Sequence, residues 1–270
     1  MEAFGIDVAK WNGSINWPKV AAAGKTFAIL KAANKQNKTE ESFEANYVGA
    51  VAAGLKVGAY KYLYALTKPE AKLEAEAIVK ACGDKNIELG IWLDMEWDGQ
   101  RKLSKAALTE IIDTEADILK AAGFKVGIYC NRDWYNNVLD SKALATRFPF
   151  WIARYPNNDV GEYKSNSSLA PRSYAQAWQY SSKGKVPGIT GNVDLNVCYT
   201  DLAVLMQPDT EKALNLMILS STQRKQLQTI LNDLGLRDYE GKMLVIDGSP
   251  GPRTHYALEE FCRWYLQEKS

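Results

Sequence analysis

The chain has 270 residues, and its 33 lysine and arginine residues nearly balance 32 acidic residues, which leaves a formal net charge of +1. This balance provides no basic field for nonspecific binding of nucleic acid, and no stretch approaches the roughly 18 apolar residues of a membrane span, so neither partner is predicted. The four cysteines form no CxxC pair and there is a single histidine, so the sequence predicts neither a metal site nor a cofactor, and chemistry must rest on carboxylates.

Strand-like and helix-like segments alternate through the first half of the chain. The strand-like segments are residues 3–9, 26–33, 55–65, 89–97 and 124–130. Helical periodicity separates them at residues 43–54, 69–82 and 104–123. This repeating βα pattern predicts a parallel sheet. Three more strand-like segments, at residues 148–155, 174–180 and 193–199, bring the count to eight, the number that closes a barrel filled by side chains.

No convincing helix separates the last three strand-like segments. We therefore predict an α/β fold, an irregular TIM-like barrel over residues 1–206 with five βα units and then three strands. The connection at residues 181–192 is rich in glycine and proline and has no helical period, so it predicts a hairpin. The strand after the hairpin would run antiparallel to its predecessor. Its early residue Asp194 would then lie at the rim where the other strands end.

A small all-α domain is predicted over residues 208–270. A capping-box pattern of Ser220 with Gln223 precedes leucine and isoleucine residues at helical spacing. A turn-rich segment then leads to a second predicted helix. The apolar residues of that helix are Leu258, Phe261, Trp264 and Tyr265.

The segment GIWLDMEWDG, residues 90–99, places Asp94 and Glu96 among apolar side chains. On a strand both acids share one face with Trp92, and barrel enzymes carry their reacting groups where the strands end. Neighbouring carboxylates repel and an apolar wall disfavours ionisation, so one acid should have a raised pKa and donate a proton near neutrality. Glu96 is the predicted donor and Asp94 the acid that stays charged. Two strand positions span roughly 6.6 Å, between the separations of retaining and inverting glycosidases, so the stereochemistry stays open.

Other side chains are expected at the same rim. Asp7 lies late in the first strand, and Lys31 ends the second. Aromatic rings at the rim would offer flat apolar faces and hydroxyl groups that hold sugar rings. The candidates are Tyr62, Tyr64, Tyr129, Trp151 and Trp178.

Several segments together resemble the glycoside hydrolase family 25 lysozymes, the Chalaropsis-type muramidases, across about residues 3–200. They are GIDVAKWNGSINW, FAILKAA, VGAYKYLYA, WLDMEW, GFKVGIYCNRDWY, FWIARYP and AWQYSSKGKVPGITGNVDLN, in the order of the family. The resemblance implies hydrolysis of the β-1,4 bond between N-acetylmuramic acid and N-acetylglucosamine in bacterial peptidoglycan. It implies that Glu96 is the general acid and that Asp94 is the nucleophile or stabilises an oxazolinium ion. Asp7 and Asp194 would be supporting acids.

Lys31, Tyr62 and Tyr129 fall at positions that resemble substrate contacts of this family. The sequence departs from the family pattern in two places. The family often reads KATEG after the second strand, where this chain has KAANK at residues 31–35, and the common histidine after GAY is Lys61. The four acids at the predicted rim are intact.

Two other functions stay open at this point. Chitinase-like barrels also carry a D-x-E ending, but they have a further acid two residues earlier, where this chain has Trp92. A non-catalytic, lectin-like barrel would bind glycan without cutting it. Such a barrel is expected to lack one of the acids, whereas four are present.

The C-terminal segment resembles a peptidoglycan-binding-like helical domain. The residues that carry this resemblance are Leu227, Leu231, Leu234, Gly235, Asp247, Gly248, Gly251, Pro252, Thr254, Ala257, Leu258 and Phe261. The alternative is a packing or dimerisation module, and hence self-association. A wall-lytic barrel with a wall-targeting module and no signal peptide resembles a bacteriophage endolysin. Such a protein would wait in the host cytoplasm and act on the wall once the membrane is permeabilised.

Overall fold

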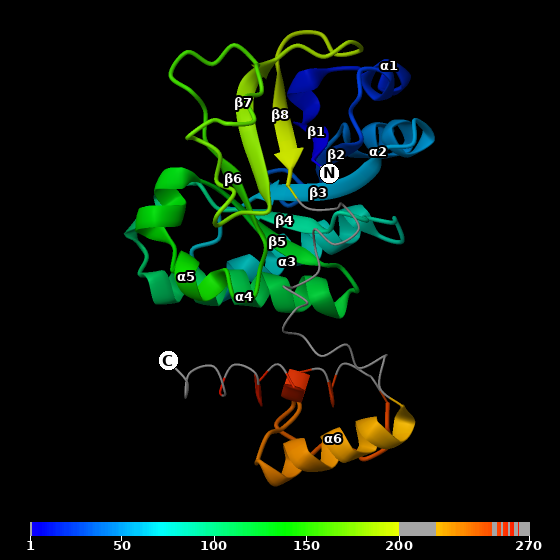
Figure 1. Ribbon diagram of the computed structural model, residues 1–270, viewed down its shortest axis with the longest axis vertical. Helices are drawn as coiled ribbons and strands as arrows, with labels where there is room; N and C mark the ends of the chain where they lie inside the picture. Colours follow the sequence, from blue (N-terminus) through cyan, green and yellow to red (C-terminus); the bar gives the residue numbers. More distant parts are fainter. Residues whose placement is uncertain are drawn as a thin grey trace. The chain divides into compact units, whose positions relative to one another are not determined.

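The computed structural model describes residues 2–199, 220–249, 253–254, 256–258, 260–261 and 264. The chain divides into two compact units, Met1–Pro208 and Asp209–Ser270. The first unit contains all eight strands of the described residues, and the second contains helix α6 (Figure 1).

The first unit is a closed eight-stranded barrel whose strands follow one another in sequence order. Neighbouring strands from β1 to β7 are parallel, and β8 is antiparallel to both β7 and β1. The strands are β1 (Ala3–Val8), β2 (Phe27–Lys31), β3 (Lys56–Tyr62), β4 (Ile91–Asp94), β5 (Val126–Asn131), β6 (Phe150–Ala153), β7 (Ala177–Gly184) and β8 (Val193–Cys198). The predicted barrel is confirmed, and so is the hairpin between its last two strands (Figure 1).

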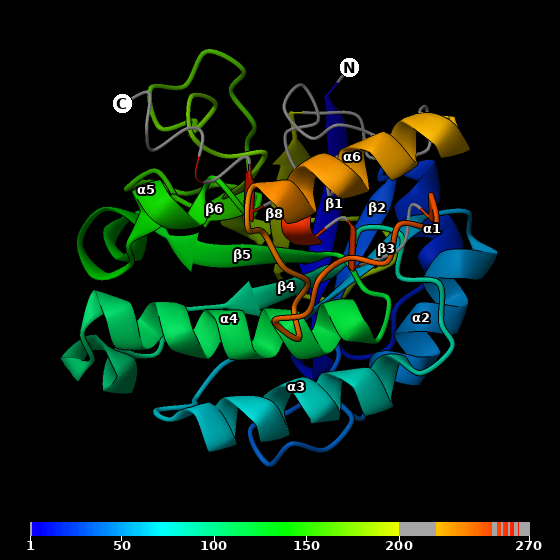
Figure 2. The same cartoon turned by 90° about the horizontal axis from the view of Figure 1, so that it is seen from below.

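Helices follow the first five strands. They are α1 (Trp17–Ala22), α2 (Phe43–Ala52), α3 (Lys68–Cys82), α4 (Lys105–Ala121) and α5 (Ser141–Leu144), with the short helical turns η1 (Lys10–Asn12), η2 (Asp98–Lys102) and η3 (Trp134–Val138). The long helices α3 and α4 pack side by side (Figure 2). Thr67 and Ser104 begin these two helices, because each side chain accepts a hydrogen bond from a backbone N–H of the first turn. Residues 154–176, between β6 and β7, contain no helix.

The side chains of β4 alternate between two separate apolar layers. Ile91 and Leu93 face the core between the sheet and the helices, whereas Trp92 faces the inside of the barrel. Gly127 makes room for the Trp92 ring, because a Cβ atom at this position would lie 2.6 Å from it. The same alternation leaves Asp94 on the inner side of the sheet, as the sequence predicts.

A buried ion pair joins β3 to α3. The Nζ of Lys61 lies 2.6 Å from Oε1 of Glu74, and both side chains are almost fully buried. Glu74 also accepts hydrogen bonds from the backbone N–H groups of Tyr64 and Ala65, just beyond the end of β3. On α4, burial raises the pKa of Glu115 well above its usual range, and the charge of Glu74 raises it further. The raised pKa favours the neutral form of Glu115, so the charge of Lys61 is balanced by that of Glu74.

The second unit is built around α6 (Ser221–Asp233), which begins with the predicted capping box of Ser220 and Gln223. Residues 253–254, 256–258, 260–261 and 264 are helical as well. Tyr265, which we assigned to the same helix, lies outside the described residues. The apolar core of this unit contains Leu231, Leu244, Ala257 and Leu258. No helix in the described parts of the chain is long and apolar enough to cross a membrane.

Replacing Glu74 by glutamine is expected to destabilise the barrel, because Lys61 would keep a buried charge without its nearest counter-charge. Removing one member of a buried ion pair costs about 3–5 kcal/mol. The free energy of unfolding, measured by urea denaturation, should fall by that amount. Glu76→Gln is the matched control on the same helix: Glu76 pairs with Lys72 on the exposed face, and its loss should cost less than about 0.5 kcal/mol. Equal losses in the two variants would contradict a structural role for the buried pair.

Candidate active site

Four carboxyl groups meet at the rim of the barrel where the parallel strands end. Asp7 lies near the end of β1, Asp94 is the last residue of β4, and Glu96 follows two residues later. Asp194 is the second residue of β8 and pairs with Asp7 across the sheet, because β8 runs antiparallel. The structure thus brings together the four acids that the sequence analysis selected.

Asp94 is buried at the end of β4, with Tyr62 of β3 and Tyr129 of β5 as its neighbours in register. Only 4% of the residue is exposed, and its Oδ1 has no hydrogen-bond partner among the described residues. Burial raises the pKa of Asp94 well above its usual range; the charge of Glu96 raises it further, and the ammonium of Lys31 lowers it. An unsatisfied buried oxygen is costly, so this atom is suited to accept a hydrogen bond from a ligand.

Glu96 lies beyond the end of the strand and is more exposed than Asp94. Burial raises the pKa of Glu96, a hydrogen bond with Asn131 lowers it, and the charge of Asp7 raises it again. Burial raises the pKa of both acids, so the pair is suited to hold a shared proton. That Glu96 is the member of the pair that carries this proton stays a prediction.

Asp7 and Asp194 form a second carboxyl pair. Oδ1 of Asp7 accepts hydrogen bonds from Nε2 of Gln179 and Nδ2 of Asn196, each at 2.8 Å. Burial raises the pKa of Asp7 to about 6, although these two hydrogen bonds and one with Asp194 lower it. Burial raises the pKa of Asp194 to about 8, and the charge of Asp7 contributes to the increase. At neutral pH Asp7 is thus mainly charged, and Asp194 is the protonated partner that donates to it.

Two predicted saccharide contacts, Tyr129 and Trp151, are instead buried inside the barrel. The hydroxyl of Tyr129 donates to Oε1 of Gln179 at 2.8 Å, and Nε1 of Trp151 donates to Oδ1 of Asn196 at 2.9 Å. These bonds orient the two amides whose nitrogen atoms bind Asp7. Tyr129 and Trp151 are only 7% and 1% exposed, because their rings fill the interior of the barrel, and neither offers an open face to a sugar.

The amides of Gln179 and Asn196, which bind Asp7, were not among the site residues predicted from the sequence. Asn196 lies two positions after Asp194 on β8 and therefore on the same face of the strand. The hydroxyl of Tyr155 is a further donor to Oε1 of Gln179. The sequence did contain a signal for both amides. Each is a polar residue at an inward-facing position of a strand, and a buried polar group needs a hydrogen-bond partner.

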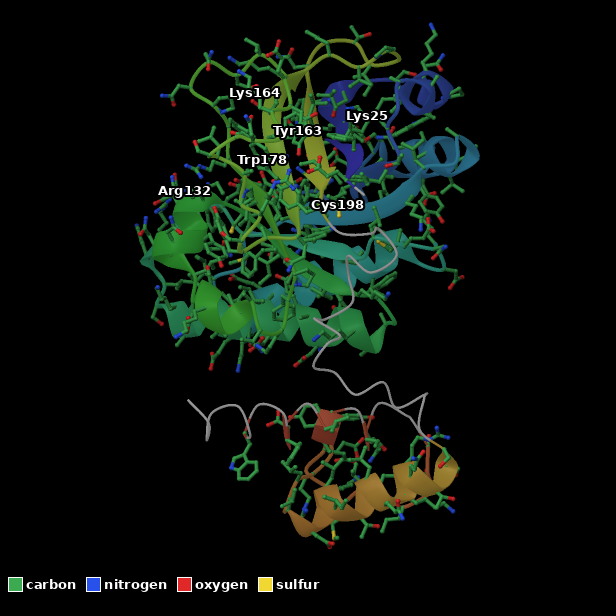
Figure 3. All side chains as sticks on the ribbon, viewed as in Figure 1. Lys25, Arg132, Tyr163, Lys164, Trp178 and Cys198 are labelled. Carbon is green, nitrogen blue, oxygen red and sulfur yellow. The ribbon has the colours of Figure 1, made fainter. Side chains whose placement is uncertain are left out.

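Trp178 points away from the site, which corrects the prediction that it contacts a sugar. Ala177 and Gln179, its neighbours on β7, face the interior of the barrel, so Trp178 faces outward. Its Nε1 donates to the backbone oxygen of Arg154 at 2.8 Å. Its ring packs 6.1 Å from that of Tyr163, centroid to centroid (Figure 3).

Lys31, Tyr62 and Tyr64 lie at the rim, as predicted. Lys31 ends β2 and Tyr62 ends β3. The ring centroids of Tyr62 and Tyr64 are 4.9 Å apart, and the Tyr64 ring lies 5.4 Å from that of Trp97. All three rings are partly exposed. Burial raises the pKa of Tyr62, and the charge of Glu96 is the next cause, so this aromatic group lies beside the acids.

This arrangement suits acid–base chemistry. One carboxyl of a pair can protonate a leaving group while the other stabilises a developing positive charge. Two carboxyl groups that flank the bond to be cut are the catalytic groups of most glycosidases. Within the part of the chain that the structure describes, no group of three or more histidine, cysteine, aspartate or glutamate side chains is placed to hold a metal ion.

Comparisons with known proteins agree on one family. The family model of the glycosyl hydrolases family 25 matches residues 6–189. Lysozyme M1 of Streptomyces globisporus is 32% identical over 205 residues, which cover 71% of this chain and 66% of that protein. The autolytic lysozyme of Clostridium acetobutylicum is 28% identical over 261 residues, which cover 95% of this chain and 72% of that protein. The crystal structure of a bacterial lysozyme from Streptomyces coelicolor superposes with a TM-score of 0.63 at 30% identity, over 77% of this chain and 97% of that one.

Asp194→Asn is expected to reduce the loss of thermal stability as the pH rises. The pKa of Asp194, about 8, lies above that of an unfolded carboxyl, so the folded chain holds the proton more tightly. Its stabilising effect is complete below about pH 4 and is lost as the pH rises towards about 8. The amide of the variant can still donate to Asp7 but has no such proton to lose. Calorimetry should therefore show a smaller decrease in Tm between about pH 5 and about pH 8 than in the parent.

The control for this experiment is Asp98→Asn, which removes an acid whose side chain is 88% exposed. Its Tm should follow the pH in the same way as that of the parent protein. Parallel curves for Asp194→Asn and the parent would contradict the assignment of the shared proton.

Proposed function

The chain belongs to the glycosyl hydrolases family 25, and from this membership we propose that it is an N-acetylmuramidase, that is, a lysozyme. It hydrolyses the β-1,4 bond between N-acetylmuramic acid and N-acetylglucosamine in bacterial peptidoglycan. The similarity to two bacterial lysozymes supports this substrate. The observation that carries the proposal is the pair of Asp94 and Glu96 at the end of β4, where burial raises both pKa values and one carboxyl oxygen has no partner among the described residues.

Substrate binding places the shared proton of this pair on Glu96. Oδ1 of Asp94 accepts a hydrogen bond from the acetamido N–H of the sugar whose bond is cut. This hydrogen bond and the nearby ammonium of Lys31 stabilise the charged form of Asp94. The proton then rests on Glu96, the more exposed acid, which reaches the glycosidic oxygen.

Glu96 is the general acid of the reaction. It donates its proton to the leaving oxygen as the glycosidic C–O bond breaks, and Asp94 stabilises the positive charge at the anomeric carbon. Asp94 does so either as the nucleophile or by stabilising the oxazolinium ion that the acetamido group forms. Water then attacks the anomeric carbon and returns a proton to Glu96. The charged Asp7 supports the reaction, because it raises the pKa of Glu96 and so keeps the acid protonated.

Glu96→Gln is expected to lower kcat on purified peptidoglycan by about 10²–10⁴, which is the usual contribution of a general acid. Thermal stability should be unchanged or higher, because the amide removes a charge beside Asp94. Asp98→Asn, a change of an exposed acid close by in sequence, is the matched control and should keep parental activity. A Glu96→Gln variant with a tenth or more of normal activity would show that another group donates the proton.

Mass spectrometry of the fragments released from purified peptidoglycan identifies which bond the protein cuts. New reducing ends at N-acetylmuramic acid would support a muramidase. Cleavage of polymers of N-acetylglucosamine alone would favour a chitinase, and binding without any release of fragments would favour a glycan-binding barrel. Cleavage of peptide or amide bonds would overturn the assignment.

We further propose that the second compact unit, residues 209–270, binds the cell wall and keeps the barrel near its substrate. Its support is the resemblance to peptidoglycan-binding-like domains and its separate apolar core. Self-association through this unit stays the alternative. Release from the host cytoplasm after membrane permeabilisation also stays a prediction. Lysis of producing cells only after a permeabilising agent is added would support it.

Removal of residues 209–270 is expected to leave a folded barrel that cuts small soluble muropeptides at the parental rate but is weaker on whole walls. The four acids all lie in the first unit, and the second would act by raising the local concentration of substrate. Pull-down with insoluble walls and turnover of soluble fragments measure the two effects separately. Equal wall binding by both forms would count against targeting, and loss of a dimer on truncation would favour the packing alternative.

A further inference from the structure

Three partly exposed rings beside the catalytic acids, those of Tyr62, Tyr64 and Trp97, form a surface that we call the aromatic ridge. Tyr64 is its central ring, in contact with both of the others. The ridge begins beside the acids, since Trp97 follows Glu96 directly and the charge of Glu96 acts on Tyr62. Flat ring faces of this kind pack against the apolar faces of sugars.

An ammonium group lies over the central ring of this ridge. The Nζ of Lys35 is 4.9 Å from the centroid of Tyr64, which is cation–π distance. Lys35 is exposed, and no carboxylate of the described residues lies within salt-bridge distance of it. It therefore presents a positive charge that is free to pair with an anion of the substrate.

The loop that carries Lys35 is tightly ordered. Oδ1 of Asn34 accepts hydrogen bonds from the backbone N–H groups of Gln36 at 3.0 Å and Lys38 at 3.2 Å. The backbone N–H of Asn34 donates to the carbonyl oxygen of Lys38 at 2.9 Å. Asn37 closes the turn with a φ of 56°, in the left-handed region that asparagine tolerates. The backbone of Lys35 is thus already in place before a ligand binds, which reduces the entropic cost of binding.

The ring under Lys35 is also held in position from the protein side. The buried Nζ of Lys61 lies 5.6 Å from the Tyr64 ring centroid. Glu74 accepts hydrogen bonds from the backbone N–H of Tyr64. The buried pair of Lys61 and Glu74, which joins β3 to α3, therefore holds Tyr64 in position under the Lys35 ammonium.

We propose that Lys35 and the aromatic ridge form a subsite that binds a carboxylate of peptidoglycan, with the sugar packed on the exposed faces of Tyr62 and Trp97 and the carboxylate on the Lys35 ammonium over Tyr64. This inference rests on the proposed muramidase function and adds a determinant of specificity to it. Two carboxylates of the substrate have the required chemistry: the lactyl group of N-acetylmuramic acid and the acids of the stem peptide.

The charges at the rim give the physical reason for such a subsite. The substrate is anionic, yet it must approach a rim with four carboxyl groups. The charged Asp7 and the shared charge of Asp94 and Glu96 repel it, and the ammonium of Lys31 offsets only part of this negative charge, through its effect on Asp94. A fixed ammonium at Lys35 offsets this repulsion and selects a saccharide that carries a carboxylate over a neutral one.

Binding is tested separately from cleavage by placing Lys35→Gln in the inactive Glu96→Gln protein. Calorimetry with peptide-free glycan strands that keep their lactyl carboxylates should give an affinity about tenfold weaker than that of Glu96→Gln alone, since a charge-assisted hydrogen bond is lost. Lys38→Gln, a change of an exposed lysine of the same loop, is the matched control and should bind as Glu96→Gln does. Lys35→Arg should restore most of the affinity.

Chemical amidation of the carboxylates identifies which one is bound. Amidated peptide-free strands should bind Glu96→Gln about tenfold more weakly, and amidation should have no further effect once Lys35 is replaced. If the effect of Lys35 appears only with strands that carry stem peptides, the bound carboxylate belongs to the peptide. Equal affinities of the Lys35→Gln and Lys38→Gln proteins for both kinds of strand would overturn the subsite. Cleavage of peptidoglycan by the parent protein is measured in a separate experiment. Absence of cleavage there would contradict the muramidase function, whereas the binding measurements test only the subsite.

Discussion

The antiparallel pairing of β8 with β7 and β1 is the constraint on which the site depends. A barrel made only of parallel strands would carry the first residues of its last strand at the opposite end. Here the hairpin reverses β8, so that Asp194 lies opposite Asp7 and Asn196 follows on the same inner face. The same pairing of β8 with β1 therefore closes the sheet and brings Asp194 next to Asp7. The hairpin of β7 and β8 supplies an acid and both amides of the site.

Burial acts on both carboxyl pairs, and their hydrogen-bond partners make them different. Asp7 accepts bonds from two amides, which favours its charged form although it is buried. Asp94 is buried as deeply, but its Oδ1 has no partner among the described residues. The first pair is thus complete within the protein, whereas the second is left to be completed by a ligand. This difference explains why Asp94 and Glu96 are the reacting pair in the proposed mechanism.

The outer surface of the site depends on groups behind the sheet. The pair of Lys61 and Glu74 is placed in the core between β3 and α3, yet Glu74 binds the backbone directly under Tyr64. The aromatic residues inside the barrel have a comparable role, because Tyr129 and Trp151 orient the amides that bind Asp7. Large buried side chains and a buried ion pair thus position the rim, where the rings of Tyr62, Tyr64 and Trp97 stay partly exposed.

The sequence by itself determined the barrel, the hairpin and the four rim acids, because these follow from local signals: hydrophobic periodicity, the composition of one connection and the alternation of side chains along strands. Only the tertiary structure decided which residues surround each acid. Asp7 is held by amides 172 and 189 positions away in the sequence, and Trp178 faces outward because its neighbours on β7 face the interior. The burial and the neighbouring charges that raise the pKa of both Asp94 and Glu96 were likewise decided in three dimensions. A pKa depends on burial and on the charges and donors within a few ångströms, and these come from strands that are far apart in the chain.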